Sequence, residues 1–124
     1  ANQEGEITRW YKPFHVDYGK QVFAQHCASC HGAEAEGAAN WTKRDETGRF
    51  PPPPLNGTAH AWHHPMGQLI HVIRFSRPNS AMPAWDETLS PGDIYSVIAW
   101  FQSLWPEEVY ATWHGINEQA KANQ

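Results

Sequence analysis

Two cysteines and a histidine lie within five consecutive residues at the end of the first quarter of the chain. The stretch reads Cys27-Ala28-Ser29-Cys30-His31 and contains both cysteines of the 124 residues. This spacing is the pattern of covalent c-type haem attachment. In that chemistry each thiol adds across one of two vinyl groups on an edge of the porphyrin, and the adjacent imidazole reaches the iron from one face. The motif therefore predicts one haem c, covalently bound through two thioethers at Cys27 and Cys30, with His31 as a metal ligand.

Three other interpretations of the cysteines remain open: a redox-active dithiol, a zinc site and a plain disulfide. A redox dithiol normally follows a strand beside a parallel sheet, whereas the residues before Cys27 have the apolar spacing of a helix. A structural zinc site usually shows a second pair of ligands at fixed spacing, which this sequence lacks. We therefore favour haem attachment.

The composition is that of one globular domain spanning residues 1–124. Hydrophobic residues make up 40% and charged residues 18%, and no apolar run approaches the roughly 20 residues that a membrane-spanning helix needs. The 9 basic and 13 acidic residues give a net charge of −4. This charge argues against nucleic acid as a partner, because its binding needs clustered Lys and Arg. The 7 Trp residues are many for a small domain, and a haem would give them something to pack against.

Apolar spacing predicts four helices, over residues 16–26, 65–76, 91–105 and 106–115. The third has the clearest start, with Ser90 as N-cap, Pro91 at the first helical position and Asp93 three residues beyond the cap. We expect Gly115 to end the fourth helix and the polar tail at 117–124 to be frayed.

A long stretch without helical spacing, residues 32–64, separates the first two helices. Some thirty residues of loop are too many for a compact domain unless the loop is functional or wraps around something. The turn signal at 45–48 favours the tip of a small hairpin within 41–50. The run of four prolines at 51–54 excludes a helix or a central strand there.

Met66 and Met82 are the 2 methionines of the chain, and either could supply a thioether sulfur as second axial ligand. Met82 precedes a proline in a turn-like loop between two expected helices. Met66 lies at the start of a helix, where an apolar packing role fits better. We therefore predict Met82 as the second metal ligand; sulfur opposite imidazole favours Fe(II) and raises the reduction potential. Two such ligands leave no open coordination position, which favours outer-sphere electron transfer over substrate turnover.

His60, His63 and His64 form a second cluster of candidate ligands. They could bind copper or zinc, or could ligate the iron in place of Met82. We favour the simpler interpretation, a polar loop whose imidazoles hydrogen-bond to neighbours or to a haem propionate. The role of the three histidines stays open.

Several motifs, in order along the chain, resemble the class I c-type cytochromes of bacteria over roughly residues 16–105. Gly19 and Phe23, ahead of the cysteine motif, match the first helix of that family. The other matching segments are the Pro-rich loop at 53–57, the distal ligand loop at 81–83 and the C-terminal helix at 89–104. The departures are the insert at 41–50, the histidine cluster at 60–64 and the C-terminal helical extension at 106–124.

The resemblance implies an all-α, cytochrome c-like fold with three to four helices and long loops wrapped around one haem. The N- and C-terminal helices are expected to cross near Gly19, with Trp100 as the partner there. The resemblance also implies that a proline carbonyl accepts the N–H of the proximal imidazole. Pro53 is our choice for that carbonyl, with Pro54 second. Such a contact fixes the tautomer of the imidazole and tunes the iron.

The expected function is that of a monohaem single-electron carrier between periplasmic redox proteins, and not that of an enzyme. The alternatives are a dedicated haem subunit of a larger dehydrogenase or oxidase, and an enzyme or gas sensor with an open iron site. The first residues, Ala1-Asn2-Gln3, are either a fragment boundary or a mature terminus left by a signal peptidase, and we expect export to the periplasm. We expect a monomer or weak dimer whose partners present a basic or neutral docking surface.

Overall fold

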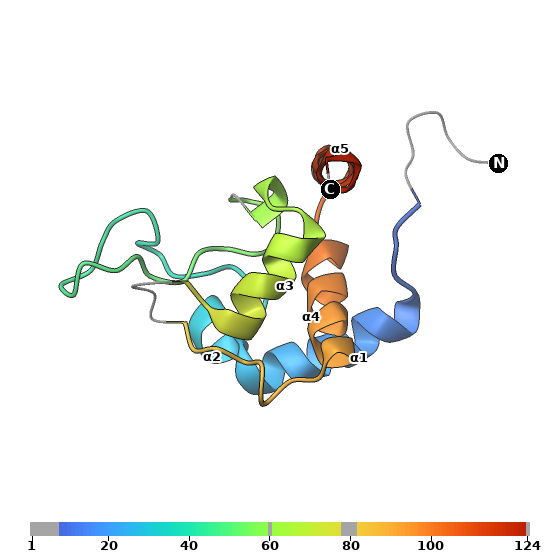
Figure 1. Ribbon diagram of the computed structural model, residues 1–124. Coiled ribbons are helices and arrows are strands. Elements are labelled where there is room, and N and C mark those ends of the chain that lie inside the picture. Colours follow the sequence, from blue (N-terminus) through green and yellow to red (C-terminus); the bar gives the residue numbers. More distant parts are fainter. Residues whose placement is uncertain (1–7, 60, 78–81, 124) are drawn as a thin grey trace.

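The computed structural model describes residues 8–59, 61–77 and 82–123, and within these residues the chain forms helices and loops without any strand (Figure 1). The all-α expectation is confirmed. The elements, in chain order, are α1 (Pro13–His26), α2 (Ala28–His31), the 3-10 turn η1 (Ala61–His63), α3 (Met66–Phe75), α4 (Pro91–Ser103) and α5 (Glu107–Ala122). Four of them match the expected helices, and α2 is a single turn that apolar spacing could not reveal. Helix α1 begins three residues earlier than expected because Pro13 occupies its first position.

Helices α1 and α4 cross with their backbones in contact at Gly19. A Cβ added to Gly19 would lie 1.8 Å from the carbonyl oxygen of Ser96 and 3.1 Å from Cβ of Trp100. The crossing expected near Gly19 is therefore present, but its closest partner is the Ser96 backbone and Trp100 comes second. Only a residue without a side chain allows this approach.

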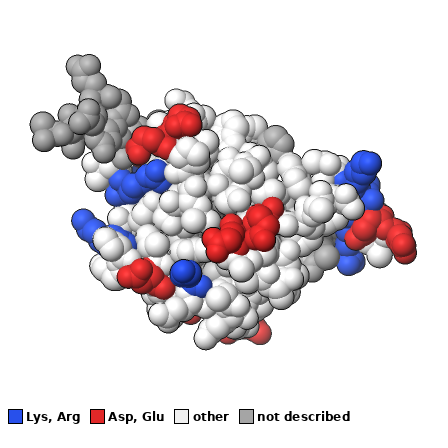
Figure 2. All heavy atoms as spheres, turned by 180° about the vertical axis from the view of Figure 1, so that it is seen from behind, with Lys and Arg blue, Asp and Glu red and all other residues white. Residues whose placement is uncertain are grey.

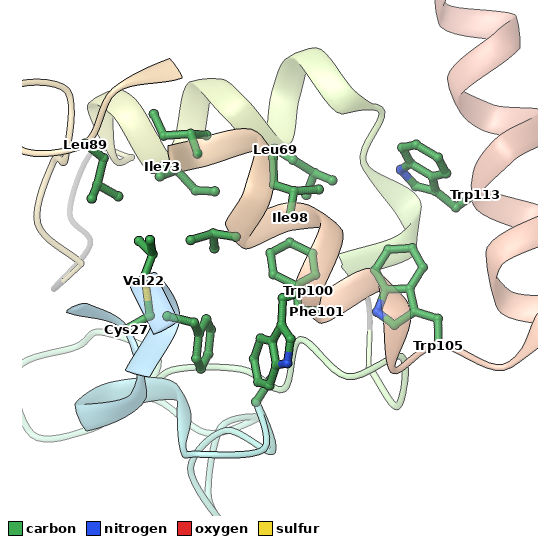
Figure 3. Close-up of a cluster of buried hydrophobic side chains, with 14 of the residues drawn as sticks. Val22, Cys27, Leu69, Ile73, Leu89, Ile98, Trp100, Phe101, Trp105 and Trp113 are labelled. Carbon is green, nitrogen blue, oxygen red and sulfur yellow. The ribbon is translucent and has the colours of Figure 1, made fainter. Parts of the chain in front are cut away.

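The core fills the space between α1, α3 and α4 and continues to α5 (Figure 3). In Figure 3, Cys27 and Val22 of the α1 region lie at one end of the buried cluster, and Trp105 and Trp113 lie at the other. The largest fully buried side chains are Trp113, Tyr110, Phe23, Ile94, Ile98, Gln102 and Val97. Trp100 packs on Phe23 with ring centroids 4.5 Å apart, so part of the aromatic load belongs to the contact between α1 and α4.

The start of α4 is the capping arrangement that the sequence predicts. The hydroxyl of Ser90 accepts the backbone N–H of Asp93, and the carboxylate of Asp93 accepts the backbone N–H of Ser90. The hydroxyl of Tyr18 donates to the same carboxylate at 2.5 Å, joining α1 to this end of α4. The hydrogen bond from Tyr18, followed by that from the Ser90 backbone, lowers the pKa of Asp93.

Helix α5 corrects two expectations about the C-terminus. It continues through Gly115 to Ala122, so Gly115 does not end it, and the segment from 117 to 122 is helical and not frayed. Asn117 is buried, and its side-chain oxygen accepts the N–H of Met66 at 2.8 Å, at the start of α3. An interior glycine costs a helix only about 1 kcal/mol, and the packing of α5 outweighs that cost.

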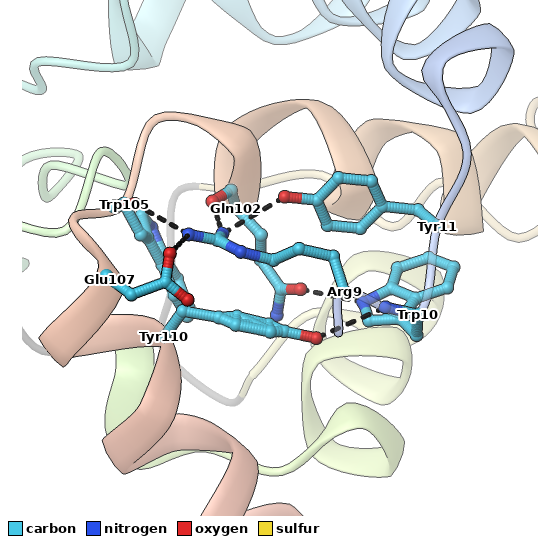
Figure 4. Close-up of polar contacts among 7 residues, drawn as sticks. All are labelled: Arg9, Trp10, Tyr11, Gln102, Trp105, Glu107 and Tyr110. Atoms are coloured by element: carbon cyan, nitrogen blue, oxygen red, sulfur yellow. Dashed lines mark hydrogen bonds and ion pairs between the residues drawn. The ribbon is translucent and has the colours of Figure 1, made fainter. Parts of the chain in front are cut away.

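Residues 9–11, ahead of the expected core, are tied to the junction of α4 and α5 (Figure 4). The guanidinium of Arg9 donates to the carbonyls of Gln102 and Trp105 at 2.9 and 3.1 Å, and it lies 4.0 Å from the ring centroid of Tyr110. The indole N–H of Trp10 donates to the side-chain oxygen of Gln102 at 2.8 Å. The N-terminal segment therefore locks the two C-terminal helices together.

The long loop makes a tight turn where a hairpin was expected. The N–H of Asp45 donates to the carbonyl of Arg49 at 2.7 Å, and the Asp45 carboxylate accepts the N–H and the hydroxyl of Thr47. No strand flanks this turn within the described residues, because its two limbs share only isolated hydrogen bonds. The turn projects to the left in Figure 1.

Figure 2 shows the molecule from behind the view of Figure 1. Acidic and basic side chains are scattered over this face and leave most of it neutral.

Candidate haem-attachment site

The cysteine motif follows α1 directly and forms one further turn of helix, α2. Cys27 is the C-cap of α1, and its carbonyl accepts the N–H of Cys30 at 3.1 Å and that of His31 at 2.9 Å. Cys27 and His31 are buried, whereas Cys30 is exposed. The motif therefore presents one thiol toward the core and one toward solvent, with the imidazole on the inner side.

The two thiols are free and are not joined in a disulfide. Burial, with a smaller contribution from the neighbouring Cys30, raises the pKa of the Cys27 thiol to about 11. Thiols used for redox chemistry or as labile nucleophiles normally have a lowered pKa. A buried thiol with a raised pKa argues against dithiol redox chemistry at Cys27.

The imidazole of His31 is held by the loop at 52–55. Its Nδ1 lies 3.0 Å from the carbonyl oxygen of Pro53. A carbonyl only accepts, so Nδ1 carries the proton and Nε2 keeps its lone pair. Burial lowers the pKa of His31, and the hydrogen bond to Pro53 partly opposes that shift. A neutral, oriented imidazole with a free Nε2 is what iron ligation requires, so the residues fit a haem.

Met82 directly follows residues 78–81, which lie outside the described residues. The hydroxyl of Ser76 donates to the carbonyl of Met82 at 2.6 Å. Ser76 caps α3 with φ of 65°, an uncommon conformation for a residue with a side chain, and this turns the chain at the end of the helix. The side chain of Met82 is half-buried against the same core cluster that contains Cys27. Sequence reasoning did not identify Ser76, because no local pattern marks it.

Aromatic side chains from the C-terminal part of the chain hydrogen-bond to the backbone of residues 55–64. The indole N–H of Trp105 donates to the carbonyl of Leu55 at 2.9 Å, and that of Trp113 donates to the carbonyl of His64 at 2.8 Å. Met66 begins α3, with its N–H bound to Asn117. These contacts join α5 and Trp105 just before it to the segment between Leu55 and Met66, a link between residues some fifty positions apart that periodicity cannot show.

The histidine cluster is only partly described. His60 lies outside the described residues, His63 is exposed at the end of η1, and His64 is half-buried. The rings of Trp62 and His63 lie edge to face with centroids 3.8 Å apart. Over the described parts of the chain, no group of three or more His, Cys, Asp or Glu side chains is placed to hold a metal ion. The same residues include no helix that is long and apolar enough to cross a bilayer.

A family model described as cytochrome c oxidase, cbb3-type, subunit III, matches residues 15–101. The chain belongs to this family. The matched range begins within α1 and ends within α4, so it contains the cysteine motif, the loop with Pro53 and Met82. Residues 9–11 and α5 lie outside it.

Two curated relatives are the FixP subunits of cbb3-type cytochrome c oxidase from Sinorhizobium medicae (strain WSM419) and Rhizobium meliloti (strain 1021). Each is 33% identical to this chain over 94 residues, which is 75% of this chain and 29% of the relative. This chain thus covers less than a third of the length of these relatives. Family membership makes the domain a class I c-type cytochrome with covalently bound haem c that serves electron transfer.

Proposed function

We propose that this chain is the electron-transfer haem domain of a cbb3-type oxidase complex, in place of the freely diffusing carrier that we first expected. The match of residues 15–101 to the subunit III family supports the complex over the carrier. The two relatives carry the name of that oxidase subunit as well. A role in transferring electrons without substrate turnover, and a position in the periplasm, are parts of the same proposal.

The proposal assigns a role to each residue of the site. Cys27 and Cys30 would hold the haem, each through an S–C bond formed by adding the thiol, sulfur and hydrogen together, across one vinyl group. His31 and Met82 would ligate the iron, and the carbonyl of Pro53 orients the imidazole of His31 through Nδ1. Bound haem supplies a one-electron redox couple. The chain keeps both ligands in place and keeps water away from the buried side of the motif.

The backbone around the two methionines supports Met82 over Met66 as the sulfur ligand. Met66 is the first residue of α3, and its N–H is fixed on Asn117 of α5. Met82 lies in a loop that the Ser76 hydroxyl ties to the end of α3. A loop can present a sulfur to a cofactor without distorting a helix, which agrees with the sequence-based choice.

Replacing Met82 with alanine is expected to open a coordination position on the iron. In oxidised protein, the weak near-infrared band of sulfur-to-iron charge transfer should disappear in Met82→Ala. Carbon monoxide should then bind rapidly to reduced Met82→Ala protein at neutral pH, but not to the unmodified protein. Loss of the sulfur ligand should also lower the reduction potential, since thioether ligation raises it.

Met66→Ala is the matched control for Met82→Ala, because it removes the same side chain and keeps the backbone N–H that binds Asn117. The near-infrared band and the resistance to carbon monoxide should both persist in Met66→Ala. The band lost in Met66→Ala but retained in Met82→Ala would assign the ligand to Met66. Absence of the band from the unmodified protein would move the assignment to a residue other than methionine.

The choice between complex and carrier is tested by fractionating native cells. Periplasm and mildly solubilised membranes are separated by gel filtration, and each fraction is assayed for this chain by antibody, for covalent haem by staining, and for oxygen consumption. The proposal expects this chain to co-elute with oxygen-consuming activity in a large detergent-solubilised particle. Elution of the whole pool as a monomer, apart from that activity, would restore the carrier.

A further inference from the structure

The backbone of Gly37 is pressed against the peptide bond between Pro53 and Pro54. A Cβ added to Gly37 would lie 2.6 Å from the carbonyl carbon of Pro53 and 2.4 Å from the nitrogen of Pro54. Both atoms belong to the backbone, so neither can swing aside as the end of a flexible side chain would. Gly37 has φ of +76°, and its N–H donates to the carbonyl of His31 at 2.7 Å.

The two segments that meet at Gly37 share hydrogen bonds on either side of the contact. The N–H of Ala38 donates to the carbonyl of Pro52 at 2.9 Å, and the N–H of Leu55 donates to the carbonyl of Ala35 at 2.8 Å. The prolines between these bonds have no N–H with which to fix their own position. The two flanking hydrogen bonds and the close approach of Gly37 therefore fix the position of the Pro53 carbonyl relative to residues 35–38.

The carbonyl carbon that a Cβ at position 37 would meet belongs to the same group whose oxygen accepts Nδ1–H of His31. A side chain at position 37 would push directly on that group and lengthen or misalign the hydrogen bond to the imidazole. Gly37 is also bonded to the carbonyl of His31, so one residue contacts both partners of this hydrogen bond. At no other described glycine is this peptide bond among the three nearest neighbours of an added Cβ.

We infer that Gly37 is a positioning residue that holds the Pro53 carbonyl on the imidazole of His31 and thereby sets the reduction potential. The inference rests on the proposed function, because it concerns the electron-transfer site. A hydrogen bond from Nδ1–H makes the imidazole a stronger donor and favours the oxidised iron. Weakening that bond by a side chain at position 37 favours the reduced form.

The test compares the haem-loaded Gly37→Ala, Gly37→Asn and Gly48→Ala proteins with the unmodified protein. Gly48 has φ of +83° and nothing within 4 Å of an added Cβ, so Gly48→Ala has a similar backbone cost without the contact. Asparagine tolerates positive φ better than alanine, so Gly37→Asn keeps the steric contact while lowering the risk that the variant does not fold. The readouts are the reduction potential from an optical redox titration and the exchange rate of Nδ1–H of His31 by NMR.

Both Gly37 variants should show a higher reduction potential, with the ratio of reduced to oxidised protein raised roughly fivefold at a fixed potential, which corresponds to weakening one hydrogen bond. Exchange of Nδ1–H of His31 should be faster in both. Gly48→Ala should match the unmodified protein in both readouts. Folded Gly37 variants with the potential and exchange rate of Gly48→Ala would overturn the inference and leave the proposed function intact. An unmodified protein that takes up no haem would instead refute the proposed function.

Discussion

Trp113→Ala should lower the free energy of unfolding of the haem-loaded protein by about 3–5 kcal/mol. The indole of Trp113 is 1% exposed and packs against Tyr110 with ring centroids 5.4 Å apart. Its N–H donates to the carbonyl of His64, so the substitution removes both a large buried surface and a bond between α5 and the loop. The free energy of unfolding of a small domain is only about 5–15 kcal/mol, so this single change removes a large part of it. Chemical denaturation followed by far-UV circular dichroism measures the loss.

Trp113→Phe separates the two contributions of the indole. It keeps an aromatic ring in the core and removes the N–H, so it should cost less than the alanine variant, about 1–3 kcal/mol. The order of stability should therefore be the unmodified protein, then phenylalanine, then alanine. An alanine variant with an unchanged denaturation midpoint would contradict the account of α5 as an integral part of the core.

Gly19→Ala is expected to force α1 and α4 apart. The added Cβ would lie 1.8 Å from the carbonyl oxygen of Ser96, a backbone atom in the middle of a buried helix. Overpacking of this kind costs about 1–3 kcal/mol, and the overlap at Gly19 places this change at the upper end of that range. Because α1 leads into the cysteine motif, we also expect a lower yield of haem-loaded protein. Thermal unfolding and the ratio of haem absorbance to total protein report the two effects.

Gly115→Ala is the matched control, since Gly115 is also inside a helix but an added Cβ meets nothing within 4 Å. Without a clash, alanine is the better helix former, so this change should raise stability by about 0.5–1 kcal/mol. A loss of stability in Gly19→Ala together with a gain in Gly115→Ala would show that the contact with Ser96, and not the loss of glycine as such, decides the result. A Gly19→Ala protein as stable as Gly115→Ala would disprove the close crossing.

The sequence predicted the parts of the fold that local patterns encode. The capping residues Ser90 and Asp93 predicted the start of α4, and the spacing of apolar residues predicted the four longer helices. Gly19 was identified as the crossing point from the family resemblance, although the backbone of Ser96 and not Trp100 is its closest partner. For the site, the cysteine motif predicted covalent haem, which the family match confirms.

What the sequence could not predict depends on contacts between distant residues. Gly115 looks like a helix end locally, but Asn117 finds a partner at the start of α3 and α5 continues past both. Arg9 and Trp10 bind Gln102, more than ninety residues away, and nothing near them in sequence marks that contact. Whether a glycine permits a turn or a close approach is likewise visible only in three dimensions, as the contrast between Gly37 and Gly48 shows.

The central claim is that the cysteine motif joins one haem to the chain, and the intact mass of protein matured together with haem-attachment machinery tests it most directly. Under denaturing conditions the unmodified protein should have the mass of the polypeptide plus one haem, with no thiol left to alkylate. Cys27→Ala and Cys30→Ala should each leave one thioether, and the double variant should have the mass of the bare chain. A colourless product at the bare-chain mass, with both thiols of the unmodified protein reacting with an alkylating reagent, would contradict the claim.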